Sequence, residues 1–198
     1  MRAFRRRRGV YLAELEGDEA TILARVVADT SMLLGVPLRP GEDPEETTDP
    51  LTELSWSTEG LDSPTDPALA RLLPDASRTD DELSQEFRRL TESELRASKV
   101  ARLRMVWDSL RVSGGEIRVP AERALDFAAA LTDVRLVIAE RLGIRTEADA
   151  EDVADRVARG GGEEEDEDEV QLALGMVYSA LSWLQESLLQ VMLPTLGE

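Results

Sequence analysis

The 198-residue sequence contains no cysteine, histidine or asparagine, and Lys99 is its only lysine. Without cysteine the chain has no disulfide, thiol nucleophile, thiolate metal ligand or thiol switch of its own. Without histidine it lacks the commonest general acid–base group and the commonest metal ligand. We therefore expect a protein that acts through binding surfaces, with no catalytic residue, metal or cofactor. The excess of arginine over lysine is typical of high-GC genomes such as those of actinobacteria.

Phosphate-binding and catalytic motifs are also missing, including GxxxxGK[ST], GxGxxG, GxSxG and HExxH. Glycines 160–162 lead into an acidic run at 163–169, not into the lysine that a phosphate cradle requires. The acidic run lacks the alternating ligands and the glycine of a calcium loop. We interpret it as a solvated linker that places negative charge before the last helix, with loose binding of divalent cations as the alternative.

The charge is strongly acidic overall but contains two basic tracts. There are 41 acidic and 23 basic residues, a net charge of −18, which disfavours indiscriminate binding to phosphates or anionic membranes. The tracts are the N-terminus and the segment 88–118, and their candidate contacts with nucleic acid or a partner are Arg5, Arg6, Arg7, Arg8, Arg88, Arg89, Arg96, Lys99, Arg102 and Arg104. No helix-turn-helix spacing accompanies them. The alternative is that these cations pair internally with acidic helices.

Hydrophobic periodicity predicts a mostly α-helical bundle. We expect helices from about Asp18 to Leu34, from Thr79 to Val112, from Pro120 to Leu142, from Thr146 to Ala158 and from Val170 to Leu193. In the long second helix, Leu83, Phe87 and Leu90 are predicted to form a buried stripe, and the polar residues 91–94 predict a kink or a division into two helices.

The last predicted helix has apolar residues at alternating steps of four and three. They are Val170, Leu174, Val177, Leu181, Leu184, Leu188 and Val191. The apolar surface is wider than a two-stranded coiled-coil seam, which favours burial within one chain over a dimer zipper. The helix also carries several polar residues, so we do not expect it to span a membrane, and monomer and homodimer both remain open.

Two short runs, 9–15 and 116–119, are rich in strand-forming residues and bounded by glycine or proline. We expect them to pair as a two-stranded β-ribbon. The N-terminal arginines resemble the start of a signal peptide, but Glu14 and Glu16 interrupt the apolar segment that should follow. We therefore expect a cytoplasmic location.

The chain is predicted to form a single helical domain over 1–198. A flexible, proline-rich, acidic loop is expected at about 38–66 and an acidic linker at about 160–169. Trp56 in the loop and Trp183 in the last helix are candidates for docking a partner. Packing onto its own domain is the alternative for Trp56.

Three groups of segments carry a family resemblance. They are 66–76 with 86–90, 130–136 with 141–144, and 177–178 with 183–188. The chain resembles an actinobacterial family, long catalogued as a domain of unknown function and now associated with oxidative-stress regulation of transcription. The resemblance implies a cytoplasmic regulator that works with an alternative sigma factor. Some members are said to sense oxidants through cysteines, and this chain has none, so a redox signal would have to come through its partner.

We accordingly expect a transcription regulator or co-regulator in the stress response, acting through a protein partner such as an alternative sigma factor. Its basic tracts would supply any contact with DNA. The alternative is a non-DNA-binding adaptor or scaffold linked to proteolysis or stress response, since the family's genes tend to neighbour that of a protease adaptor.

Overall fold

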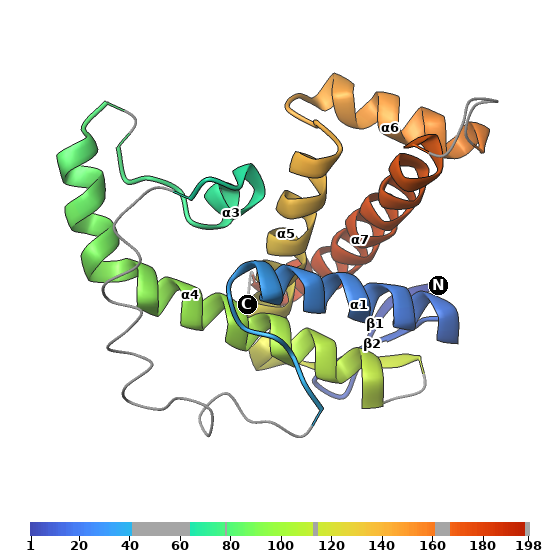
Figure 1. Cartoon of the computed structure of the whole chain (residues 1–198). Helices are drawn as coiled ribbons and strands as arrows, with labels where there is room; N and C mark the ends of the chain where they lie inside the picture. Colours follow the sequence, from blue (N-terminus) through green and yellow to red (C-terminus); the bar gives the residue numbers. More distant parts are fainter. Residues whose placement is uncertain (41–63, 78, 113–114, 161–166, 197–198) are drawn as a thin grey trace.

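The computed structural model describes residues 1–40, 64–77, 79–112, 115–160 and 167–196. It is a mostly α-helical bundle with a small antiparallel sheet (Figure 1). Trp56, most of the predicted loop at 38–66 and residues 161–166 of the predicted acidic linker lie outside the described residues. Within the described residues, none of the helices combines the length and the apolar character needed to cross a bilayer.

The sheet contains the predicted ribbon and one further strand. The elements β2 (Val10–Glu14) and β3 (Glu116–Pro120) pair antiparallel as expected, with Leu12 opposite Arg118. The strand β1 (Arg2–Arg7) adds to the other edge of β2, although its arginines gave no apolar signal. Gly115 enters β3 at φ 105°, where a Cβ would lie 2.2 Å from the carbonyl oxygen of Leu15, so only glycine fits.

The core lies between the sheet and the helices α1 (Gly17–Leu33), α4 (Asp81–Val112), α5 (Ala124–Arg141) and α7 (Glu167–Leu196). A 3₁₀ turn, η1 (Ala121–Arg123), connects β3 to α5. The rings of Phe4 and Phe127 meet edge to face with centroids 6.1 Å apart, which ties the sheet to α5. From α7 the residues buried in this core are Leu181, Leu184, Leu188 and Met192. The predicted seam of α7 is thus used inside the chain, except that Val170 is 61% exposed.

Two shorter helices are attached to this core. The helix α3 (Pro67–Leu72) packs on α5, and Asp66 caps its N-terminus by accepting from the amides of Ala68 and Leu69. The helix α6 (Glu147–Arg159) packs on α7 and begins at the predicted cap, Thr146. Figure 1 shows α3 and α6 on the side of the bundle where α5 rises from the body.

The helix predicted from Pro120 begins at Ala124, after β3 and η1, and the helix predicted from Val170 begins at Glu167. Two predicted helix caps were also placed slightly wrong. For α1 the cap is Glu16, which forms a capping box with Glu19, so Asp18 lies inside the first turn. For α4 the amide of Leu83 is capped by Asp80, and the helix begins at Asp81, after Thr79. Each of these two caps lies within two residues of its prediction, because several acidic residues compete to cap the same turn.

Of the two alternatives predicted for the second helix, a kink or a division into two helices, the structure has the first: α4 is one continuous but bent element (Figure 1). Its C-terminal part is packed in the bundle, where Leu103, Val106 and Leu110 are buried. Its N-terminal part changes direction and projects away from the body (Figure 1). We call this projecting part, residues 81–95, the α4 arm.

Candidate protein-interaction surfaces

The N-terminal hairpin presents a group of basic side chains. Arg8 and Gly9 form its turn, both with positive φ (52° and 79°), as a two-residue hairpin turn requires. The residues Arg5, Arg6, Arg7 and Arg8 are all exposed. Glu14 neutralises Arg5 at 2.9 Å, whereas within the described residues Arg6, Arg7 and Arg8 make no ion pair.

The predicted cations of α4 do not form a comparable free surface. Arg88 is only 7% exposed and lies between Asp75 and Glu92. Burial opposes the charge of Arg88, but hydrogen bonds to Glu92 and Asp75 outweigh this effect, and its pKa lies above the ordinary value. Arg96 also bonds to Glu92, at 2.6 Å, and to the carbonyl oxygen of Leu34.

The remaining α4 cations are engaged as well. Lys99 donates to the buried carboxylate of Asp133 at 2.5 Å. Arg102 lies 3.3 Å from the carboxylate of Asp126. The other contacts are Arg89 with Glu86, and Arg104 with both the carbonyl oxygen of Arg39 and the ring of Trp107. Five of these six cations are therefore paired with carboxylates of the chain, which was the alternative left open by the sequence. The exception is Arg104, which has no acidic partner among the described residues.

Trp183, the second docking candidate, lies on α7 and is 40% exposed. Met176, seven residues earlier on the same helix, is 56% exposed. A spacing of seven places the two side chains on one face of the helix. The indole of Trp183 is therefore available to a partner. It lies on α7, apart in sequence from the N-terminal hairpin and from the α4 arm.

A further exposed apolar surface is one that the sequence placed in the core. On the α4 arm, Leu83, Phe87 and Leu90 are 54%, 49% and 61% exposed. Their spacing of four and three residues aligns them on one face of the helix. The prediction of a buried stripe was wrong because the arm extends beyond the helices that would have covered it. We call these three residues the arm stripe.

The inner face of the arm is polar and is covered by residues 75–77. Ser84, 7% exposed, donates to the carbonyl oxygen of Ser77 at 2.9 Å and accepts from the amide of the same residue at 3.0 Å. Four residues along, Arg88 joins Asp75 to Glu92. These bonds fold the connection from α3 back onto the arm, so the usual arrangement is inverted: the polar side is covered and the apolar side faces out.

The positions of the carboxylates and one groove are the features of the described residues that bear on catalysis. Among them no group of three or more carboxylates is placed to hold a metal ion. A groove of about 400 Å³ between α1 and α4 is lined by Arg25, Trp107, Leu110, Arg111 and small residues, with no carboxylate in the lining. It therefore contains no pair of groups for acid–base chemistry.

Sequence reasoning missed the arm stripe because its signal is ambiguous. The spacing of Leu83, Phe87 and Leu90 is the pattern of a core-facing helix. A second signal existed in the same turns, where Ser84 and Arg88 are spaced by four residues opposite the apolar side. Only the ion pair of Arg88 with Asp75, thirteen residues away, shows which of the two faces is covered.

Comparison with protein families matches residues 1–192 to the family described as Domain of unknown function (DUF2017). No curated protein matches the chain, and no solved structure does.

Proposed function

This chain belongs to the DUF2017 family, and from that premise we propose that it is a regulatory protein that works by binding another protein. In this proposal it is a cytoplasmic transcription regulator or co-regulator of the stress response. The resemblance noted in the sequence suggests an alternative sigma factor as the partner. The signal reaches the chain through that partner, because the chain has no cysteine to oxidise.

The arm stripe is the observation that carries the proposal. Leu83, Phe87 and Leu90 lie on a projecting helix whose other face is fixed by hydrogen bonds and ion pairs. Large apolar side chains that gather on one exposed helix face are typical of a protein-interaction site. From Leu83 to Leu90 there are seven residue steps, about 10 Å along the helix axis, which is two turns of a partner helix.

Contact with DNA is a secondary part of the proposal and rests on the basic hairpin. Arg6, Arg7 and Arg8 are exposed and adjacent, and could each meet a phosphate. The net charge of −18 opposes binding to any long stretch of DNA. The hairpin would therefore add to an affinity that the protein partner supplies.

A non-DNA-binding adaptor or scaffold in proteolysis or stress response is the second candidate. Its support is the pairing of the α4 cations, since Arg88, Lys99 and Arg102 are occupied by carboxylates of the chain itself. Both candidates use the arm stripe, and they differ in the identity of the partner and in the role of the hairpin.

Affinity capture from the native host tests the proposal. The bait is the full chain, compared with Leu83→Ser/Leu90→Ser and with the control Leu125→Ser, which changes a leucine on α5 that is 62% exposed. We expect the wild-type chain and the control to retain a sigma factor or another transcription component that the arm variant loses. If the arm variant instead loses a protease component that the other two baits retain, the adaptor is favoured. Equal capture by all three baits would refute binding through the arm.

A further inference from the structure

We propose that the α4 arm binds a basic amphipathic helix, in which an apolar stripe is flanked by lysine or arginine. This inference rests on the proposed function and specifies the chemistry of the partner. The arm stripe supplies the apolar contact, and the acidic side chains around it favour a partner helix with positive charge.

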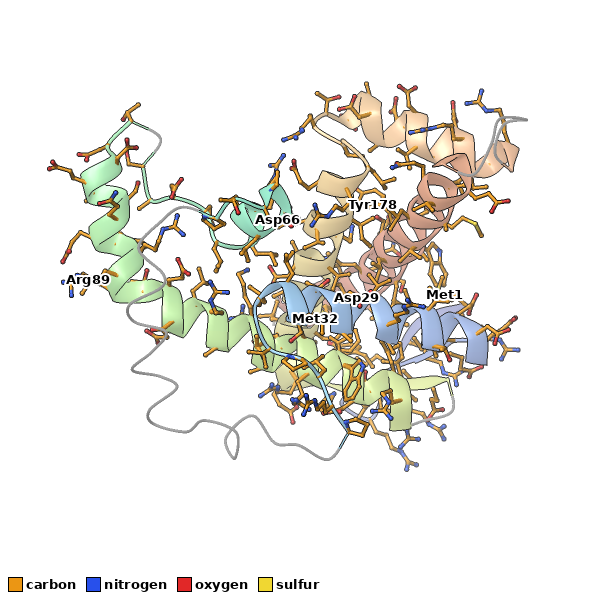
Figure 2. All side chains as sticks on the ribbon, viewed as in Figure 1. Met1, Asp29, Met32, Asp66, Arg89 and Tyr178 are labelled. Atoms are coloured by element: carbon orange, nitrogen blue, oxygen red, sulfur yellow. The ribbon has the colours of Figure 1, made fainter. Side chains whose placement is uncertain are left out.

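The exposed charges of the arm are mostly negative. Asp80, at the cap of the arm, and Asp81, Glu82, Glu86 and Glu94 are exposed. Arg89 is the exposed arginine among residues 80–95, and it is bonded to Glu86 at 2.6 Å. Five exposed carboxylates against one exposed arginine give the outer surface of the arm a negative charge, and Figure 2 shows Arg89 on its far side from the bundle.

The positions of these carboxylates place them along the arm stripe. Glu86 lies three residues after Leu83 and four before Leu90, so it borders the stripe directly. Glu94, four residues after Leu90, stands at the C-terminal end of the stripe. Asp80, three residues before Leu83, stands at the other end and caps the helix. A partner helix lying on the stripe would meet acidic groups at its edge and at both ends.

The same charges disfavour a second copy of this chain as the occupant. Two arms packed stripe to stripe would bring Glu82 and Glu86 of one copy toward acidic residues of the other. Like charges at the edge of a helix pair destabilise it, whereas opposite charges set the choice of partner. The net charge of −18 on each copy adds to the repulsion.

The arm is also already helical in the chain by itself. Ser84 and Arg88 anchor its inner face to residues 75–77, so the helix does not have to fold on contact. An ordered surface avoids the entropic cost of ordering on binding. Because Ser84 and Arg88 face inward, changes on the outer face can be made without disturbing these anchors.

Two synthetic helical peptides test the inference. They share one apolar stripe, and their flanking positions are all lysine in the first peptide and all glutamate in the second. Fluorescence anisotropy would measure binding to the full chain. We expect the lysine peptide to bind at least about tenfold more tightly at low salt, and added salt to reduce the difference because it screens exposed charges.

Three variants make the test specific. Leu83→Ser/Leu90→Ser should abolish binding of both peptides, and Leu125→Ser should bind as the wild-type chain does. Glu82→Lys/Glu94→Lys leaves three exposed acidic and three exposed basic residues on the arm, so it should abolish the preference for the lysine peptide. Circular dichroism of each variant would verify that the helices are retained.

Equal affinity for the two peptides, or no binding of either, would overturn the inference. So would sedimentation equilibrium showing a dimer that Leu83→Ser/Leu90→Ser dissociates, because a second copy would then cover the stripe. If host proteins are captured through the arm but the peptides bind equally, the proposed function stands and this inference fails. If the lysine peptide is preferred but no host protein is captured through the arm, the proposed function fails and this inference stands.

Discussion

Two phenylalanines show how differently one residue type is used in this molecule. Phe127 on α5 is 1% exposed and packs edge to face against Phe4. Phe87 on the α4 arm is 49% exposed and lies in the arm stripe. A buried ring stabilises the fold through the apolar area it removes from water, whereas a half-exposed ring is available to a partner.

Substitution by alanine should separate these two roles. Phe127→Ala should lower the free energy of unfolding by about 3–5 kcal/mol, because it removes buried contacts and leaves a cavity. Phe87→Ala should change it by less than about 1 kcal/mol, since surface substitutions have small effects. Urea denaturation of both variants measures the difference. Similar losses at the two positions would show that Phe87 is covered in the folded protein.

Lys99 and Asp133 form a buried ion pair, with side chains that are 14% and 6% exposed. Asp133 as a whole residue is 4% exposed, and its second oxygen, Oδ2, has no hydrogen-bond partner among the described atoms. A carboxylate in this position depends on the ammonium group to compensate the cost of leaving water.

Removing one partner of this pair should destabilise the protein strongly. Lys99→Met leaves the carboxylate of Asp133 uncompensated and should cost about 3–5 kcal/mol. The double variant Lys99→Met/Asp133→Leu removes both charges and should recover most of that loss. Thermal and urea unfolding of the single and double variants test this. A double variant as unstable as the single one would mean that packing, and not the unpaired charge, causes the loss.

At the scale of elements, ion pairs attach α3 to α5. Arg71 of α3 donates to Glu140 of α5 at 2.8 Å, and Arg145 bonds to the other oxygen of the same carboxylate. Asp66, which caps α3, accepts from Arg141 at 2.6 Å. Figure 2 shows Asp66 where α3 approaches α5. Both attachments involve carboxylates whose protonation would break them.

The stability that Glu140 contributes should therefore depend on pH. Its pKa lies below the ordinary value of 4.5, chiefly because of the hydrogen bond from Arg71, with burial opposing and Arg145 adding to the effect. A carboxylate with a lowered folded pKa stabilises the folded state fully above its unfolded pKa. This stabilisation is lost as the pH falls through the folded value.

The variant Glu140→Gln lacks this pH-dependent contribution. It should be less stable than the wild type at pH values above about 5, and the gap should narrow as the pH falls below about 4. Urea unfolding at a series of pH values gives the comparison, with Glu151→Gln on the exposed side of α6 as the control. A gap that stays constant with pH would indicate that the ionised form of Glu140 is not what holds α3.

At the scale of the whole molecule, charge is distributed very unevenly. The chain carries a net charge of −18, yet the arginines of the hairpin stand together at one end of the sheet. Most of the α4 cations are paired with acidic side chains, so they add little to the electrostatic attraction of an anionic partner. Any binding of DNA should consequently depend on few contacts.

Salt dependence measures the number of those contacts. If three arginines each neutralise one phosphate, the logarithm of the binding constant should fall with the logarithm of salt with a slope of about −3. Arg6→Gln/Arg7→Gln/Arg8→Gln should remove this slope, whereas Arg102→Gln should leave it nearly unchanged because Asp126 pairs with that arginine. A slope that responds to Arg102 and not to the hairpin would move the DNA contact to α4. No binding at low salt would favour the adaptor.

The sequence by itself determined much of the architecture. Local periodicity placed the helices, because an amphipathic pattern holds along one element regardless of its neighbours. The strands β2 and β3 were predicted to pair since each was too short to be stable alone. The absence of cysteine and histidine excludes disulfides, thiol switches and imidazole groups from the chain itself.

Tertiary structure alone decided which faces are covered. A pattern such as Leu83, Phe87 and Leu90 shows that a helix face is apolar, but not that another element lies against it. The outcome depended on Arg88 and Asp75, whose pairing holds the polar side of the arm inward and leaves the apolar side exposed. Such a pairing depends on where the chain returns in space, and the spacing of residues along one helix carries no record of it.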